Sequence, residues 1–261
     1  MSKQTKTTYE QALLNAKKKQ QQNAEPSRLA VWMPRILPLI VIVAGLILTA
    51  SRLLSLESEV LFKSQEFNLW IADDSFYQMF SIYPGGWLAW TASYMTEFFF
   101  HPAVGVWMLM GCWALIMGML ALLFRLRGWK VLLTAIVPLM LLACLTQTGY
   151  WLYYQKVHGQ LWLPTLGVGF SVLAALVVSQ LVERAQKMSA VKHWLLAAVK
   201  AVAMLAFAWW GYKLMGAWSY LGLALMAVTA KVNCQKAVVG YVAWAALACA
   251  LVGIVPKLAY Q

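Results

Sequence analysis

Two adjacent carboxylates, Asp73 and Asp74, are the residues of this chain whose type and spacing best suit chemistry. They lie in the one long connection between apolar segments, at about 55–102. A carboxylate there could accept a proton from a substrate hydroxyl, or help to hold a divalent metal ion. Paired aspartates are also common at helix N-caps and in solvated loops, and this structural interpretation is the favoured one.

Polar residues inside apolar runs form a second group of candidates. Lys200 lies within an apolar run at 194–212, and an intramembrane charge is by default a hypothesis of function. A lysine can also extend its ammonium group to the cytoplasmic interface, which costs less and is the preferred interpretation. Gln147, flanked by two threonines, could line a cavity, but hydrogen bonding between helices is favoured.

The remaining chemical residue types predict neither a metal site nor a cofactor site. His101, His158 and His193 fall on different connections between apolar runs. No two cysteines form a Cys-x-x-Cys pair, so we expect free thiols that pack as small apolar side chains. Gly-x-Ser-x-Gly, P-loop and Rossmann glycine patterns are absent from the sequence.

The elements that position these residues must be membrane helices. The chain has 261 residues, of which 62% are hydrophobic and 11% charged, whereas soluble domains are about 45–50% apolar and about 25% charged. A spanning helix needs about 20 apolar residues. We therefore predict an all-α, polytopic transmembrane helix bundle over residues 30–261, preceded by a basic cytoplasmic tail over 1–29. Seven apolar runs are expected as spans, at about 33–54, 103–124, 131–152, 161–182, 194–212, 215–230 and 238–256.

Charge alternates along the connections between these runs. Basic residues concentrate before the first span and at about 125–130, 184–192 and 231–236, while the intervening connections carry far fewer. By the positive-inside rule this predicts a cytoplasmic N-terminus and an extracytoplasmic C-terminus in a bacterial cytoplasmic (inner) membrane. The same placement explains the net charge of +12 without nucleic acid, so the lipid bilayer is the expected partner.

The long first outer connection, about 55–102, is too apolar to be a free loop. Aromatic and aliphatic residues recur at helical spacing on both sides of Pro84, Gly85 and Gly86, which break any helix. We therefore expect two helices that lie in the outer interface, one on each side of this break, and that roof the spans. Pro102 and Gly105 then begin the second span.

Residues 81–105 resemble an uncharacterised family of multi-pass membrane proteins from gut-associated bacteria. In that family a Pro-Gly-Gly turn and a Phe-Phe-x-x-Pro-x-x-Gly stretch follow the first span. The matching residues are Pro84, Gly85, Gly86, Phe98, Phe99, Pro102 and Gly105. The resemblance implies a multi-pass membrane protein and supplies no activity.

Three functional hypotheses follow. The first is a non-enzymatic scaffold, or a subunit that binds a membrane-protein partner, in envelope biogenesis, because few polar residues converge within the spans. The second is an enzyme similar in outline to multi-spanning glycosyltransferases, which use lipid-linked donors and keep a catalytic carboxylate in the first outer loop; Asp73 or Asp74 would fill that role. The third is a transporter, which rests on Lys200 and Gln147 alone.

Overall fold

The computed structural model describes residues 28–68, 70–151, 159, 161–187, 193–233, 242 and 244–248. Within these ranges every element is helical, as the predicted all-α class requires. The elements in chain order are α2 (Arg28–Leu56), α3 (Ser58–Glu66), α4 (Asp74–Ser81), α5 (Gly86–Thr96), the 3₁₀ helix η1 (Glu97–Phe100), α6 (Pro102–Leu123), the 3₁₀ helix η2 (Gly128–Ala135), α7 (Ile136–Trp151), α8 (Trp162–Lys187), α9 (His193–Met215) and α10 (Trp218–Asn233).

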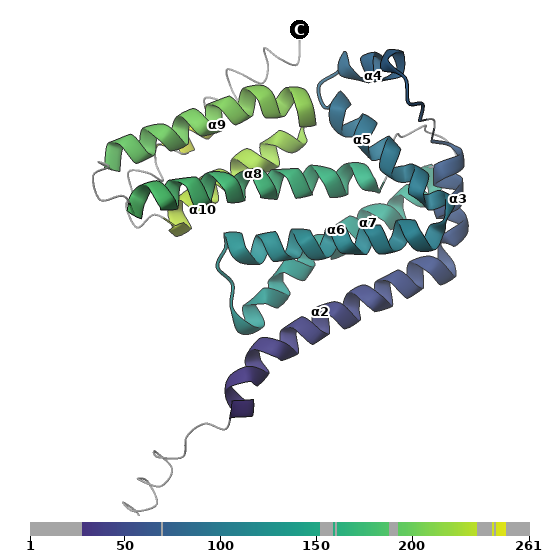
Figure 1. Cartoon of the computed structure of the whole chain (residues 1–261), viewed down its shortest axis with the longest axis horizontal. Coiled ribbons are helices and arrows are strands. Elements are labelled where there is room, and N and C mark those ends of the chain that lie inside the picture. The colour runs from purple at the N-terminus through teal and green to yellow at the C-terminus, as the bar shows by residue number, and fades with distance from the viewer. Residues whose placement is uncertain are drawn as a thin grey trace, which may run out of the picture.

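The long helices stack side by side, and α3, α4 and α5 gather at one end of the stack (Figure 1). Helix α8 packs against α6 on one side and against α10 on the other. By length and composition, three helical segments in the described residues can cross a membrane: Ile36–Leu56, Pro102–Leu123 and Trp162–Arg184. These segments support a membrane protein, and they match three of the expected spans closely.

The described residues do not confirm the other expected spans, although α9 and α10 fall on the expected runs at 194–212 and 215–230. The expected helix at 131–152 is divided into the 3₁₀ helix η2 and helix α7, which meet between Ala135 and Ile136. Helix α9 has 23 residues but carries Lys200 and Lys213, and α10 has 16 residues. Most of the expected span at 238–256, and the tail up to residue 27, lie outside the described residues.

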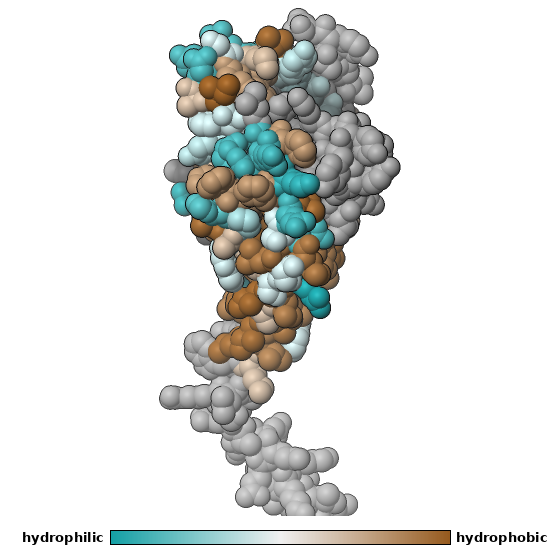
Figure 2. Space-filling model, turned by 90° about the vertical axis from the view of Figure 1, so that its right-hand side faces the viewer, coloured by the Kyte–Doolittle hydropathy of each residue, from teal (hydrophilic) through white to brown (hydrophobic). Residues whose placement is uncertain are grey.

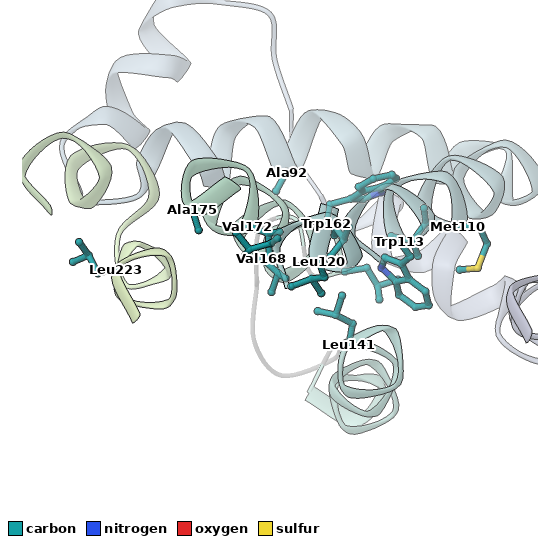
Figure 3. Close-up of a cluster of buried hydrophobic side chains, with 14 of the residues drawn as sticks. Ala92, Met110, Trp113, Leu120, Leu141, Trp162, Val168, Val172, Ala175 and Leu223 are labelled. Atoms are coloured by element: carbon teal, nitrogen blue, oxygen red, sulfur yellow. The ribbon is translucent and has the colours of Figure 1, made fainter. Parts of the chain in front are cut away.

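The core is a cluster of apolar side chains contributed by α2, α3, α5, η1, α6, α7, α8, α9 and α10, and part of it is drawn in Figure 3. Trp113 and Trp162 are its largest fully buried members. The Trp113 indole donates a hydrogen bond of 3.1 Å to the Thr165 hydroxyl, which joins α6 to α8. A buried indole N–H without an acceptor would cost about 1–3 kcal/mol, so this bond fixes the register of the two helices.

Small residues bring α8 and α10 together. A Cβ atom on Gly167 would lie 2.5 Å from the Trp218 ring, so no larger residue fits there. One turn further along α8, the Ser171 hydroxyl lies 2.8 Å from the Trp218 carbonyl oxygen and 2.7 Å from that of Gly167. Small residues that allow close backbone approach are typical of helix contacts in membranes.

The segment between α2 and α6 contains three α-helices and η1, not the two helices expected from sequence. Residues 58–100 are called the lid below. The expected helix before Pro84 is interrupted between Glu66 and Asp74. At this break the Asn68 side-chain amide donates to the Ser93 carbonyl at 2.9 Å and to the Glu97 carboxylate at 2.8 Å.

Two glycine turns attach the lid to the bundle. Gly85 has a φ of +86°, which only glycine adopts freely, and its amide donates a 3.0 Å hydrogen bond to the Lys213 carbonyl at the end of α9. Gly216, between α9 and α10, has a φ of +58°. A Cβ atom on Gly216 would lie 3.0 Å from the Pro84 carbonyl oxygen, so the two turns touch through their backbones.

A carboxylate holds the lid helices to one another. Glu97 accepts hydrogen bonds from the Gln65 amide at 2.9 Å and from the Asn68 amide at 2.8 Å. These contacts join the end of α3 to η1. Figure 2 shows hydrophilic side chains over the lid end of the molecule and apolar side chains along α2 below it.

Basic connections meet at the opposite end of the stack. The Arg125 guanidinium forms a 2.6 Å salt bridge with the Glu183 carboxylate of α8. Arg125 has a φ of +52°, while its amide donates to the Leu122 carbonyl and that of Leu126 donates to the Ala121 carbonyl. This is a Schellman ending of α6 with arginine in the position that usually holds glycine.

We expect Gly86→Val to disrupt the turn between α4 and α5. A Cβ atom there would lie 1.8 Å from the Phe80 carbonyl oxygen, so the backbone must move. The expected destabilisation is about 1–3 kcal/mol, as for overpacked sites. Gly111→Val in α6 is the matched control, because nothing lies within 4 Å of its Cβ position. Thermal unfolding and limited proteolysis should show a loosened lid in the first variant only, and equal stability would contradict the contact.

Glu97→Ala should release α3 from η1. The Gln65 and Asn68 amides would lose their shared acceptor, at a cost of about 1–3 kcal/mol. Glu97→Gln should lose less, because one acceptor oxygen remains. The control is Glu66→Ala, which removes an exposed carboxylate from the end of α3, next to Gln65. Proteolytic cleavage between residues 67 and 73 should rise for Glu97→Ala alone, and unchanged cleavage would show that the network does not hold the lid.

Candidate functional site

The cavity that contains the predicted carboxylates lies in the lid, where the start of α4 faces α5. It has a volume of about 450 Å³ and is called the lid cavity below. The hollow is open to the surrounding solvent along one side. Its lining residues are Trp70, Ala72, Asp73, Asp74, Tyr77, Trp87 and Trp90.

Asp73 and Asp74 stand at the rim of the lid cavity. Asp73 precedes the first residue of α4 and its carbonyl accepts from the Tyr77 amide at 3.1 Å, yet its carboxylate makes no capping hydrogen bond. Both side chains are exposed. Neither carboxylate takes part in an ion pair or a side-chain hydrogen bond within the described part of the chain. The N-cap position favoured from sequence is therefore confirmed for Asp73, without the bond that usually accompanies it.

Aromatic rings form the walls of the lid cavity. The Trp90 ring lies 5.9 Å from that of Trp70 and 5.6 Å from that of Tyr77, measured between centroids. The Trp70 ring also packs on Tyr94 at 4.8 Å, and Trp87 packs on Phe170 of α8 at 5.4 Å. The indole nitrogens of Trp70 and Trp90 are buried, so these two residues present carbon surface to the cavity.

This combination of groups restricts the chemistry of the cavity. Its lining includes two acidic residues and no basic residue, so the lining carries a net negative charge. Among the described residues, no group of three or more His, Cys, Asp or Glu side chains is placed to hold a metal ion. The carboxylates can therefore attract a cation or accept a proton, whereas the rings offer an apolar, electron-rich surface.

The predicted turn and span residues have structural roles. Pro84 and Gly85 contact the turn between α9 and α10, whereas Gly86 packs on the Phe80 carbonyl of α4. All three border a second cavity of about 430 Å³ with mainly apolar lining. Pro102 is the first residue of α6, where its missing N–H has no cost. A Cβ atom on Gly105 would lie 2.3 Å from the Phe99 ring, so glycine lets η1 fold back onto α6.

The structure does not bring the intramembrane candidates into the lid cavity. Lys200 is buried, with 2% of its surface exposed, and does not extend to solvent as the snorkelling interpretation expected. It precedes Lys213, at the lid end of α9, by about 20 Å of helix. Gln147 lies in α7, but its side chain is outside the described residues, as are the side chains of His158 and His193.

Sequence reasoning missed the aromatic walls as a site. Trp87 and Trp90 stand three residues apart on α5, and this spacing was interpreted as an apolar face against lipid or the bundle. The sequence did contain a signal for this site. A second aromatic segment, from Trp70 to Tyr77, precedes α5 and also carries the two aspartates.

Comparison of the chain with protein-family models, curated proteins and solved structures finds no match. The likeness of residues 81–105 to a family of multi-pass membrane proteins therefore stays a prediction. Function has to be argued from the helices and from the lid cavity.

Proposed function

We propose that this chain is a non-enzymatic component of the bacterial cytoplasmic membrane that binds a partner in envelope biogenesis. Its N-terminus is cytoplasmic, the stack of helices crosses the bilayer several times, and the lid is on the outer side. The lid is the part of the chain that presents binding groups to the outside.

The observation that carries this proposal is the separation of charge between the two ends of the stack. Six acidic residues lie in the lid or at its borders: Glu57, Glu59, Glu66, Asp73, Asp74 and Glu97. The opposite end carries Arg125, Arg127 and Lys130, together with Arg184 near the end of α8. Basic residues favour the cytoplasmic side of a membrane, which supports an outward-facing lid.

The attachment of the lid supports a binding role. It is held by backbone contacts at Gly85 and Gly216 and by the Glu97 network, so its surface is fixed relative to the helices. A surface that is ordered before binding loses less conformational entropy when a partner docks. Such a surface suits a scaffold or a partner-binding subunit.

A second candidate is a glycosyltransferase-like enzyme that uses a lipid-linked donor. The observation that favours it is the position of Asp73 and Asp74 on a cavity large enough for a small molecule. One of the two would accept the proton of the acceptor hydroxyl. A transporter is the third candidate, supported by the buried Lys200.

Labelling with a membrane-impermeant thiol reagent tests the orientation. After the native cysteines are replaced by serine, Glu59→Cys in the lid should react in intact spheroplasts. Arg127→Cys at the opposite end should react only after the membrane is opened. A reporter fused after residue 261 should lie outside the cytoplasm. Labelling of Arg127→Cys in intact spheroplasts would contradict the proposed topology.

A complementation experiment separates the binding proposal from the enzyme proposal. A strain that lacks the gene is tested for envelope sensitivity to detergent, with wild type or variants supplied in trans. If a carboxylate is the base, Asp73→Asn/Asp74→Asn should abolish rescue at normal expression, and Asp74→Asn alone should be nearly as severe. Wild-type rescue by the double variant would rule out the enzyme. Failure of Gly86→Val to reduce rescue would count against a role for the lid in binding.

A further inference from the structure

We propose that the lid cavity binds an alkylammonium group, of the kind carried by amine-bearing lipid headgroups and by free amino alcohols. The aspartates at the rim would neutralise its charge, and the ring faces of the walls would contact its carbon atoms. This inference goes beyond the proposed function and does not depend on a protein partner.

The first argument is the chemistry of the cavity wall. Four aromatic residues line it, namely Trp70, Tyr77, Trp87 and Trp90. Aromatic faces attract cations, tryptophan most strongly, and enclosures of such rings recognise alkylated ammonium groups. The indole nitrogens of Trp70 and Trp90 are buried, so these two residues present carbon surface to the cavity.

The second argument is the state of the carboxylates. The Asp73 side chain makes no capping hydrogen bond to α4, and neither aspartate is paired with a basic residue of the described chain. Two neighbouring negative charges repel each other, and a monovalent cation between them relieves this repulsion. The carboxylates are therefore available to a ligand.

The third argument excludes a metal ion as the natural occupant. Calcium takes 6–8 oxygen ligands, and magnesium keeps a shell of ordered water. The lid cavity offers two side-chain carboxylates, and most of its remaining lining is ring carbon. A weakly hydrated organic cation fits such walls better than a strongly hydrated metal ion does.

The test is calorimetric titration of the purified full chain in a maltoside detergent. The probes are choline, ethanolamine and 3,3-dimethylbutan-1-ol, a neutral molecule with the shape of choline. We expect saturable binding of at least one amine, and affinity at least about tenfold weaker for the neutral probe. Equal binding of the neutral probe would overturn the proposal, because the charge would then contribute nothing.

Variants locate the binding to the lid cavity. Asp73→Asn/Asp74→Asn removes both charges from exposed positions and should weaken amine binding by at least about tenfold. Glu59→Gln/Glu66→Gln removes the same charge from elsewhere on the lid and should leave binding unchanged. Trp90→Leu should also weaken binding, whereas Trp107→Leu on the exposed face of α6 should not. Unchanged binding in the aspartate double variant would overturn the site even if Trp90→Leu fails to fold.

A second arm identifies the source of the ammonium group. The chain is reconstituted in nanodiscs of phosphatidylglycerol with or without phosphatidylethanolamine, and choline binding is measured in each. Competition by phosphatidylethanolamine supports a lipid headgroup, and undiminished choline binding supports a free amine. If neither free amines nor the amine lipid bind in a manner that depends on Asp73 and Asp74, the proposal is wrong. That failure would leave the proposed function in place, because partner binding is measured in cells.

Discussion

The contact between two glycine turns determines how the lid sits on the helices. Gly85 and Gly216 meet through their backbones, and the Gly85 amide bonds to the last turn of α9. Neither turn could carry a side chain without moving the other, so the contact fixes α5 against α9 and α10. Helix α5 in turn carries Trp87 and Trp90, so the shape of the lid cavity depends on a contact made by residues outside it.

The polar groups of the molecule have two different roles: some complete internal hydrogen bonds, and others are exposed without a partner in the described residues. Inside the stack they complete internal hydrogen bonds, as Thr165 does for Trp113 and Ser171 for the end of the α9–α10 turn. In the lid, Glu97 does the same for two amides. Asp73 and Asp74 are different, because they are charged, exposed and uncommitted within the described residues. This contrast, more than their sequence spacing, marks them as groups for a ligand.

Several features of the fold could be predicted from local sequence patterns, whereas others depend on residues that are distant in the sequence. Apolar length and the proline at its start placed α6 to within one residue of its expected limits, and the Pro84-Gly85-Gly86 break is present. The break after α3 was missed, because the partners of Asn68 there lie 25 and 29 residues later in the chain. The change from 3₁₀ to α geometry after Ala135 was also missed, since apolar periodicity does not distinguish the two. The cavity walls required two segments to be placed face to face, which spacing within one segment cannot show.

The 3₁₀ geometry of η2 changes how far the chain reaches. An α-helix rises about 1.5 Å per residue, so the 16 residues of α7 alone extend about 24 Å, short of the roughly 30 Å of a bilayer core. A 3₁₀ helix rises about 2.0 Å per residue, and the eight residues of η2 therefore add about 16 Å. The two helices together therefore have a contour length of about 40 Å from Gly128 to Trp151. This length exceeds the thickness of the hydrocarbon layer, which leaves room for a tilted or curved passage through the lipid.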